Sequence, residues 1–557
     1  MTRLALLWHM HQPNYVDPAT GVPVLPWVRL HAIKDYRGMV DMLGAYPRVR
    51  ATFNLVPSLL AQIERAVGGG ARDRLYAVGL ADAAGLGSDD RAFLVAHGFH
   101  APHHRMIAPY PRYAELHEQR HLDATDWTLE ALRDLQVWHR LAWMDPDWLV
   151  GDDRLRRLVD QGRDFTEGDK QALASVEEEL LATTIPAYRK AQDRGQVELA
   201  TSPYYHPILP LLCDTDAHLV SFPDALVPEP PFRWPDDARE QVARAVRAHE
   251  GWFGRPPLGL WPSEGAVSNL MVPIVAAAGF QWMASDEDIL ARSLGVELAR
   301  DADGLLLRPE VLYRPYELQA GGRRLRMLFR DHALSDRIGF TYQSWDPRHA
   351  ADDFLWRVGE SGRRFSARTG GEDATIAVIL DGENAWEYYA GGGRAFLREV
   401  YRRLQDAPDI EAVTMAKAVT GPAAALLHLH AGSWIHANFH IWAGHADDRR
   451  AWSQLSRARA TFDARSPMVG EASRTRAFEA LLAAEGSDWF WWYGDDHSSG
   501  QDDVFDALFR AQLRQVYEAL GMPAPAELHR SNRSVSAAPG AGGSMESVTD
   551  VSGGSDL

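Results

Sequence analysis

Short apolar runs alternate with helical patterns over about the first 390 residues of the chain. The run LALLW precedes an amphipathic stretch through KDYRGMVDMLGAY, and VELATSPYYHPIL, LGLWPSEG and TIAVIL each indicate a strand that enters a loop. Apolar positions at helical spacing predict long helices over 166–194 and 236–254, the second begun by Pro235 and capped by Gly254. Repeated strand, loop and helix predict a parallel sheet, and this length favours an α/β barrel over an open sheet.

The pattern becomes helical beyond about residue 410. DDRRAWSQLSRARATFDA, EASRTRAFEALLAA and DDVFDALFRAQLRQVYEALG carry apolar residues three and four apart, which predicts a helical bundle. The last stretch is rich in Ser and Gly and predicts a disordered tail. We therefore expect a catalytic barrel with helical insertions over 1–405, an α-helical domain that contributes to the cleft over 406–525, and a disordered tail over 526–557.

Composition narrows the classes of partner. With 76 acidic and 58 basic side chains the formal charge is -18, which disfavours nucleic acid and anionic membranes as partners. The single cysteine, Cys213, rules out an internal disulfide. LALLW is too short for a signal-peptide core and nothing approaches a membrane span of about 20 apolar residues. We expect a cytoplasmic protein with a neutral or cationic ligand.

Tryptophan is unusually abundant, with 19 residues. Most should be buried in the core, but several stand beside polar residues in Gly-rich stretches: Trp386, Trp434, Trp442, Trp489, Trp491 and Trp492. Flat apolar faces edged by hydrogen-bonding groups suit sugar rings.

Two acids occupy strand ends. Glu264 in GLWPSEGAVS and Asp381 in TIAVILDGENAWEYY each follow an apolar strand, and the carboxyl ends of parallel strands form the active face of a barrel. Taken alone, each acid is explained equally well as a carboxylate that caps the next helix. Together they supply what glycosidic cleavage needs, since one carboxylate supports the anomeric carbon and a protonated one donates to the leaving oxygen. Trp261 and Trp386, close in sequence to these acids, favour a sugar substrate.

Further polar groups lie at other predicted strand ends. Glu198 and His206 flank SPYYHP, and Asp331 and His332 follow RMLF. Each is more often structural than functional, because buried polar groups commonly satisfy loop hydrogen bonds. Their convergence on strand ends makes them candidate substrate-binding residues.

A metal site is the alternative interpretation. His9 and His11 in LLWHMHQP point to one side of a strand, and with His206, His332 and Asp381 they form a possible zinc set of the amidohydrolase or polysaccharide deacetylase kind. A lone pair of histidines on one strand face is more often a hydrogen-bonding pair than a metal site, and a metal would leave the paired acids without a role. We therefore predict no metal and no cofactor.

Five segments, in order, carry a family resemblance: HMHQP, GQVELATSPYYHPILPLL, GLWPSEGAVS, VILDGENAWEYY and GSWIHANFHIWAGH. They resemble the sequence regions of glycoside hydrolase family 57, most closely the amylopullulanase and α-amylase type, over roughly residues 1–520. The resemblance implies a seven-stranded (β/α) barrel followed by a helical domain, and a retaining mechanism on α-glucans without a catalytic metal. It implies Glu264 as nucleophile, Asp381 as general acid/base, and His11 beside the sugar.

The resulting hypothesis is a retaining hydrolase of α-1,4-glucans, with α-1,6 activity open and an α-glucan or maltooligosaccharide as its partner. The aromatic residues Trp434 and Trp442 join the predicted substrate site. Shared catalytic residues leave a 4-α-glucanotransferase or branching-type transglycosylase as an alternative, and an inactive glycan-binding protein as another class. The oligomeric state stays open.

Overall fold

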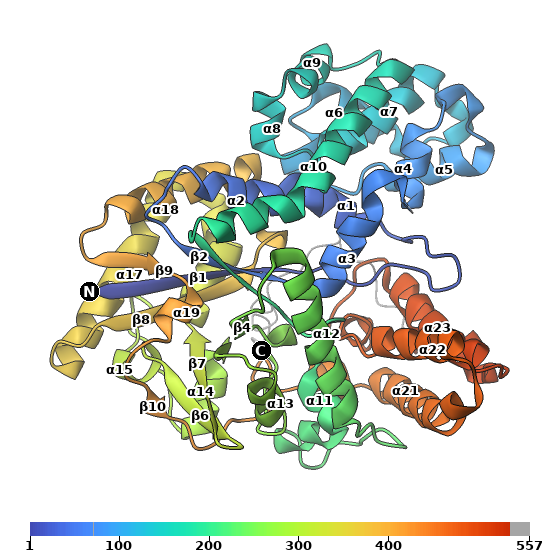
Figure 1. Ribbon diagram of the computed structural model, residues 1–557. Helices are drawn as coiled ribbons and strands as arrows, with labels where there is room; N and C mark the ends of the chain where they lie inside the picture. The colour runs from blue at the N-terminus through green and yellow to red at the C-terminus, as the bar shows by residue number, and fades with distance from the viewer. Residues whose placement is uncertain (71, 535–557) are drawn as a thin grey trace, which may run out of the picture.

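The computed structural model describes residues 1–70 and 72–534, and within them seven parallel strands form a barrel (Figure 1). These strands are β1 (Thr2–Met10), β2 (Ala51–Leu55), β3 (Val197–Ala200), β4 (Gly259–Leu260), β5 (Trp282–Asp286), β7 (Arg323–Arg330) and β8 (Ala374–Asp381). Each pairs with the next in this order, β3 reaching β4 through a single bridge, and β8 returns to β1. The predicted α/β barrel is confirmed, with the seven strands that the resemblance implies.

Alternation along the strands explains where polar groups emerge. Leu4, Leu6 and Trp8 of β1 pack outward against the helices, whereas Ala5 and Leu7 join the core inside the barrel. Because strand residues alternate between faces, the next positions on the inner face are His9 and His11. By the same rule Ala377 and Ile379 of β8, both in the inner core, lead to Asp381.

A long helical insertion separates β2 from β3, and most of it forms the lobe at the top of Figure 1. Its helices are α3 (Pro57–Ala66), α4 (Arg74–Leu80), α5 (Ser88–His97), α6 (Pro111–Glu118), α7 (Leu129–Leu141), α8 (Pro146–Gly151), α9 (Asp153–Gln161) and α10 (Glu167–Asp193). The helix predicted over 166–194 is α10, which Thr166 and Asp169 begin with reciprocal side-chain to backbone bonds. The helix predicted over 236–254 is α12 (Pro235–Phe253), ended by Gly254 at φ 75°.

Eleven further helices of the described residues precede the three long C-terminal helices. They are α1 (Trp27–His31), α2 (Arg37–Leu43), α11 (Leu209–Cys213), α13 (Val272–Ala277), α14 (Glu287–Leu294), α15 (Pro309–Leu312), α16 (His332–Asp336), α17 (Pro347–Thr369), α18 (Arg394–Asp406), α19 (Met415–Ala418) and α20 (His440–Ala443). A hairpin strand, β6 (Tyr316–Ala320), pairs antiparallel with β7.

The chain after residue 405 still contributes to the sheet before it becomes helical. β9 (Ile410–Val413) pairs with the first half of β1, and β10 (Ala424–Ala425) pairs with β6. The three predicted helical segments follow as α21 (Ala446–Arg465), α22 (Glu471–Ala484) and α23 (Asp502–Ala519), which pack together at the lower right of Figure 1.

The ordered chain continues past the boundary predicted at residue 525. Leu528 is buried, and the Asn532 amide donates to Gln454 Oε1 of α21 at 3.0 Å. The rest of the predicted disordered tail, 535–557, lies outside the described residues. Among the residues that are described, no helix has the length and apolar character needed to cross a membrane.

Candidate active site

A cavity of about 160 Å³ opens at the carboxyl ends of the barrel strands. Its lining comes from the ends of β1 and β8, the loop after β4, helix α1 and the segment between α22 and α23. Glu264, Asp381, His11 and Trp434 line it, together with residues that sequence reasoning did not assign to the site, foremost Asp488. Four tryptophans, a tyrosine and a phenylalanine supply its aromatic surface: Trp27, Trp434, Trp491, Trp492, Tyr15 and Phe505.

Glu264 is held in a strained turn after β4. Its backbone has φ 56° and ψ 26°, a left-handed conformation that costs a non-glycine residue about 1 kcal/mol or more. Gly265 follows at φ 57°, a backbone conformation that favours glycine, and a side chain there would also crowd Trp434 and Trp261 at 3.1 and 3.2 Å. The Trp434 indole donates to Glu264 Oε2 at 3.0 Å, and its backbone N–H donates to the Glu264 carbonyl. The turn therefore fixes the carboxyl group against an indole.

Asp381 ends β8, and its own strand delivers it to the cavity. Gly382 then turns the chain so closely over β1 that a side chain there would clash with Met10 Sδ. This turn places Glu383 against β1, where its Oε1 accepts from the His11 backbone N–H at 3.1 Å. Three carboxyl groups, Glu264, Asp381 and Glu383, thus share one cavity.

Burial shifts the acid–base behaviour of all three groups. Burial, and then the charges of Asp381 and Asp488, raise the pKa of Glu264 to about 8. Burial raises the pKa of Asp381 to about 6, while His11 and Arg330 act to lower it. The pKa of Glu383 stands well above its ordinary value, through burial and then the charge of Asp381. The site therefore retains carboxyl protons at neutral pH.

Three histidines stack beside these acids. The rings of His11 and His206 lie 3.8 Å apart, and His9 and His206 are 5.2 Å apart between ring centroids. His9 Nδ1 meets the Asn54 amide at 2.8 Å, and burial lowers its pKa well below the ordinary value. His9 is therefore a neutral imidazole that accepts a hydrogen bond from Asn54.

Asp488 joins the helical region to this histidine stack. Its Oδ1 lies 2.7 Å from His11 Nε2, although the two residues are 477 positions apart in sequence. Trp491, three residues after Asp488, also lines the cavity, and Ser499 and Gln501 extend the same wall. The run DWFWWY was the available signal, since an acid precedes clustered aromatics there, but no local pattern links it to the first strand.

His206 and Trp261 stand directly behind the lining. His206 Nδ1 lies 3.9 Å from Glu264 Oε1 and 3.1 Å from Ser487 Oγ. Trp261 is fully buried and packs edge-on against Trp434 at 5.3 Å. Both support residues of the cavity wall.

Trp386 and Trp442 are also buried behind it. Trp386 packs edge-on against Trp8 and donates to the Gly382 carbonyl at 2.8 Å. Trp442 lies 5.6 Å from Trp491 between ring centroids and so backs a lining residue.

The other predicted polar residues lie away from the cavity lining. Glu198 accepts from Trp282 Nε1 at 2.7 Å and from the Ala416 backbone N–H at 2.7 Å, near the amino end of β3. Asp331 accepts from the Tyr313 hydroxyl at 2.6 Å and caps α16. These bonds hold barrel and helix together, so both acids have structural partners.

His332 belongs to a separate ionic cluster. Its Nδ1 lies 3.1 Å from Asp286, its Nε2 lies 2.9 Å from Asp336, and these carboxylates raise its pKa to about 10. It does not join His9 and His11, so the full zinc set of the alternative interpretation is not brought together. A smaller set does converge, because ligand atoms of His11, His206 and Asp488 lie within 4.8 Å of one another.

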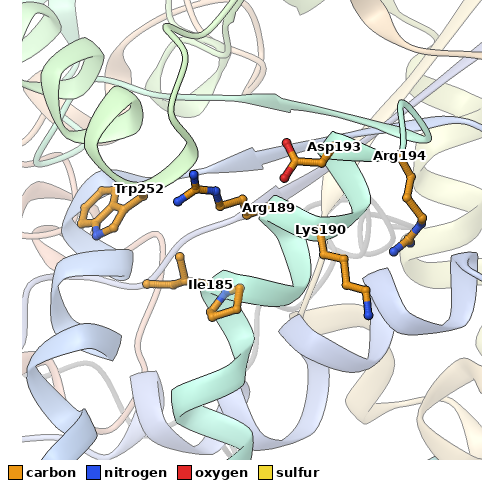
Figure 2. A pocket seen from close by; sticks show the side chains of 7 residues that line it. Ile185, Arg189, Lys190, Asp193, Arg194 and Trp252 are labelled. Atoms are coloured by element: carbon orange, nitrogen blue, oxygen red, sulfur yellow. The ribbon is translucent and has the colours of Figure 1, made fainter.

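A larger and more open hollow of about 510 Å³ lies elsewhere, between the end of α10 and Trp252 of α12 (Figure 2). Arg189, Lys190 and Arg194 give it a basic lining, and Asp193 is its single acid. It lacks a pair of carboxyl groups, so the smaller cavity is the candidate catalytic centre despite its size.

The strand ends of this parallel α/β barrel deliver two largely buried acids to one aromatic cavity. Such an arrangement fits glycosidic cleavage, which needs two carboxyl groups at one bond. The family model for glycosyl hydrolase family 57 matches residues 5–425. The chain belongs to glycosyl hydrolase family 57.

Solved structures share the fold over nearly the whole chain. A branching enzyme from Pyrococcus horikoshii is similar at 15% identity and a TM-score of 0.60, covering 95% of this chain and 93% of that one. A branching enzyme from Thermococcus kodakaraensis matches at 15% identity and a TM-score of 0.57, over 93% and 88%. An α-amylase from Thermotoga maritima matches at 12% identity and 0.56, over 93% of both chains.

Proposed function

We propose that the protein is a retaining enzyme that cleaves α-1,4-glucosidic bonds of glucans, with Glu264 as nucleophile and Asp381 as general acid/base. The observation that carries the proposal is that both acids line one cavity whose walls hold several tryptophans, in a chain of a glycoside hydrolase family. Indole faces stack on sugar rings, and the confined volume favours a single ring at the acids.

The chemistry follows from these two positions. Asp381 donates its proton to the leaving oxygen as Glu264 attacks the anomeric carbon, which breaks the glucosidic bond and forms a β-glucosyl ester. Asp381, now a carboxylate, takes a proton from an incoming hydroxyl group, which displaces Glu264 and restores the α configuration. His11, held by Asp488, would orient the sugar hydroxyl groups at this centre.

The productive form carries one proton between the two acids. Because the pKa of Glu264 is about 8 and that of Asp381 about 6, the proton lies on Glu264 between these two pH values. Nucleophilic attack by Glu264 requires the proton to lie on Asp381 instead. A bound sugar favours the exchange, because the ring covers Asp381 and the positive charge that develops at the anomeric carbon stabilises the Glu264 carboxylate. The Trp434 hydrogen bond to Glu264 acts in the same direction.

The deciding experiment is the product profile from maltoheptaose, with the Glu264→Gln protein as the blank and NMR of the first product for its anomeric configuration. Shorter α-configured products that the variant does not make support a retaining hydrolase. Shorter and longer products together support the glucanotransferase alternative with the same residues. A β-configured first product, or equal turnover by the variant, would refute the proposed roles.

The two further alternatives, a branching-type transglycosylase and an inactive glycan-binding protein, need separate experiments. Amylose as substrate, with debranching of the product, detects new α-1,6 links made by a branching-type transglycosylase. Binding of maltoheptaose without turnover of any glucan would support a glycan-binding protein. A run with chelator tests whether a metal at His11, His206 and Asp488 takes part, as their geometry permits.

A further inference from the structure

A second group of histidines and acids lies beyond the cavity wall, where α20 and α21 meet the segment before α23. One ring nitrogen of His440, one of His445 and a carboxylate oxygen of Asp496 lie within 4.8 Å of one another. His440 belongs to α20, His445 caps α21, and Asp496 belongs to the segment 493–501. None of the three lines the cavity of the candidate active site.

We propose that His440, His445 and Asp496 bind a divalent transition metal ion of the zinc type. Imidazole nitrogen and carboxylate oxygen are ligands that Zn²⁺ takes in proteins, usually four in number. Asp495 Oδ1, 3.8 Å from His445 Nε2, is in reach to complete the set. The assignment is independent of the proposed glucan chemistry.

The hydrogen bonds of His445 support a ligand role. Its Nδ1 lies 3.1 Å from Asp448 Oδ2, and Asp448 is fully buried. Its Nε2 faces the other way, 3.1 Å from Asp496 Oδ2. Histidines that bind metals usually donate their second ring N–H to a carboxylate, which fixes the ring and its tautomer. Asp448 is placed to do this while Nε2 faces Asp496.

Two glycines make room for the imidazole rings. A side chain at Gly494 would clash with the His445 ring, and one at Gly444 would clash with His440 Nδ1. The backbone of the segment 493–501 therefore lies directly against His445. This close approach brings Asp495 and Asp496 to the histidines from a segment that is distant in sequence.

A bound ion would fasten the cavity wall. Segment 493–501 carries Ser499 and Gln501, which line the cavity, and Gln501 Oε1 accepts from the Trp27 indole at 3.0 Å. Cross-linking this segment to the start of α21 would order it. Without a metal ion, His445 forms ion pairs with Asp448 and Asp496, because these two carboxylates raise the pKa of His445 to about 10. The experiment must separate these two states.

The test uses the full chain stripped with EDTA, desalted and titrated with ZnCl₂ by calorimetry, with bound zinc counted by elemental analysis. We expect one tightly bound Zn²⁺ per chain and slower hydrogen exchange over 493–501 when it is bound. Asp496→Asn and His440→Gln should weaken this binding at least tenfold, with circular dichroism to verify folding. Co²⁺ in place of Zn²⁺ should give the visible spectrum of a tetrahedral site in the wild type only.

Two control variants locate the ion. His428→Gln alters an exposed imidazole outside the group and should retain full binding. Asp488→Asn removes a carboxylate from another set of possible ligands, which also holds His11 and His206, and this variant should retain full zinc binding too. The proposal is overturned if no zinc binds, if Asp496→Asn and His440→Gln bind as the wild type does, or if Asp488→Asn alone loses the ion.

Discussion

Replacing Glu264 by Gln should stabilise the protein while it removes activity. The Glu264 side chain is largely buried, and this burial with the charges of Asp381 and Asp488 raises its pKa to about 8 from an ordinary value of 4.5. Gln keeps the size and the acceptor for the Trp434 indole but has no charge to desolvate. The gain therefore measures the cost of keeping an ionisable group at this position.

The sign and size follow from proton linkage. A carboxyl group whose pKa is raised by folding contributes its full stability below pH 4.5 and loses it as pH rises to 8. Each pH unit in that interval is worth about 1.4 kcal/mol, so Gln should gain nothing at pH 4 and up to about 3 kcal/mol at pH 7. Since the side chain is 17% exposed, this figure is an upper bound.

Urea unfolding at pH 4, 5, 6, 7 and 8, followed by both tryptophan fluorescence and circular dichroism, measures the difference in free energy of unfolding. Glu411→Gln on β9 is the matched control, because Glu411 is an exposed glutamate in a strand and should change stability by less than about 0.5 kcal/mol at every pH. A gain for Glu264→Gln that is equal at pH 4 and pH 7, or absent at both, would refute the reasoning.

The remaining predictions concern turnover. Asp381→Asn should lower kcat on maltooligosaccharides by roughly 10²–10⁴-fold but much less on aryl glucosides with good leaving groups, and equal losses on both would contradict its acid role. Trp434→Phe removes a hydrogen bond that lowers the pKa of Glu264, so the alkaline limb of the pH profile of kcat/KM should move to higher pH and kcat/KM should fall roughly tenfold or more. Asp488→Asn removes a negative charge that raises the same pKa, so that limb should move to lower pH, and a shift in the same direction as for Trp434→Phe would count against both.

The barrel and its polar strand ends were predictable because their information is local. Apolar runs with strand length in LALLW and TIAVIL specify buried parallel strands, and alternation then fixes the faces of His9, His11 and Asp381. The caps of α10 and α12 are equally local, since Thr166 and Gly254 act within one helical turn. Such features need no knowledge of the rest of the chain.

The less predictable features depend on contacts between distant segments. Glu198 was expected at the carboxyl end of a strand, but β3 runs only from Val197 to Ala200, so Glu198 lies near its amino end. Asp331 does follow a strand, yet Tyr313 and Arg300 bind it from 18 and 31 residues earlier in the chain, beyond the reach of any local pattern. Asp488 was missed for the same reason, because its partner His11 lies in the first strand region.

The position of β1 at the centre of the sheet has a consequence for synthesis of the chain on the ribosome. β1 pairs with β8 over eight of its nine residues, from Thr2 with Ala374 to His9 with Asp381, and its first half pairs with β9. Both partners are synthesised hundreds of residues after β1. The apolar strand β1 therefore keeps an unpaired edge until translation has passed Val413, the last residue of β9. Nascent chains of this protein are thus exposed to aggregation for most of their translation, and chaperones that cover apolar segments should associate with them until the barrel closes.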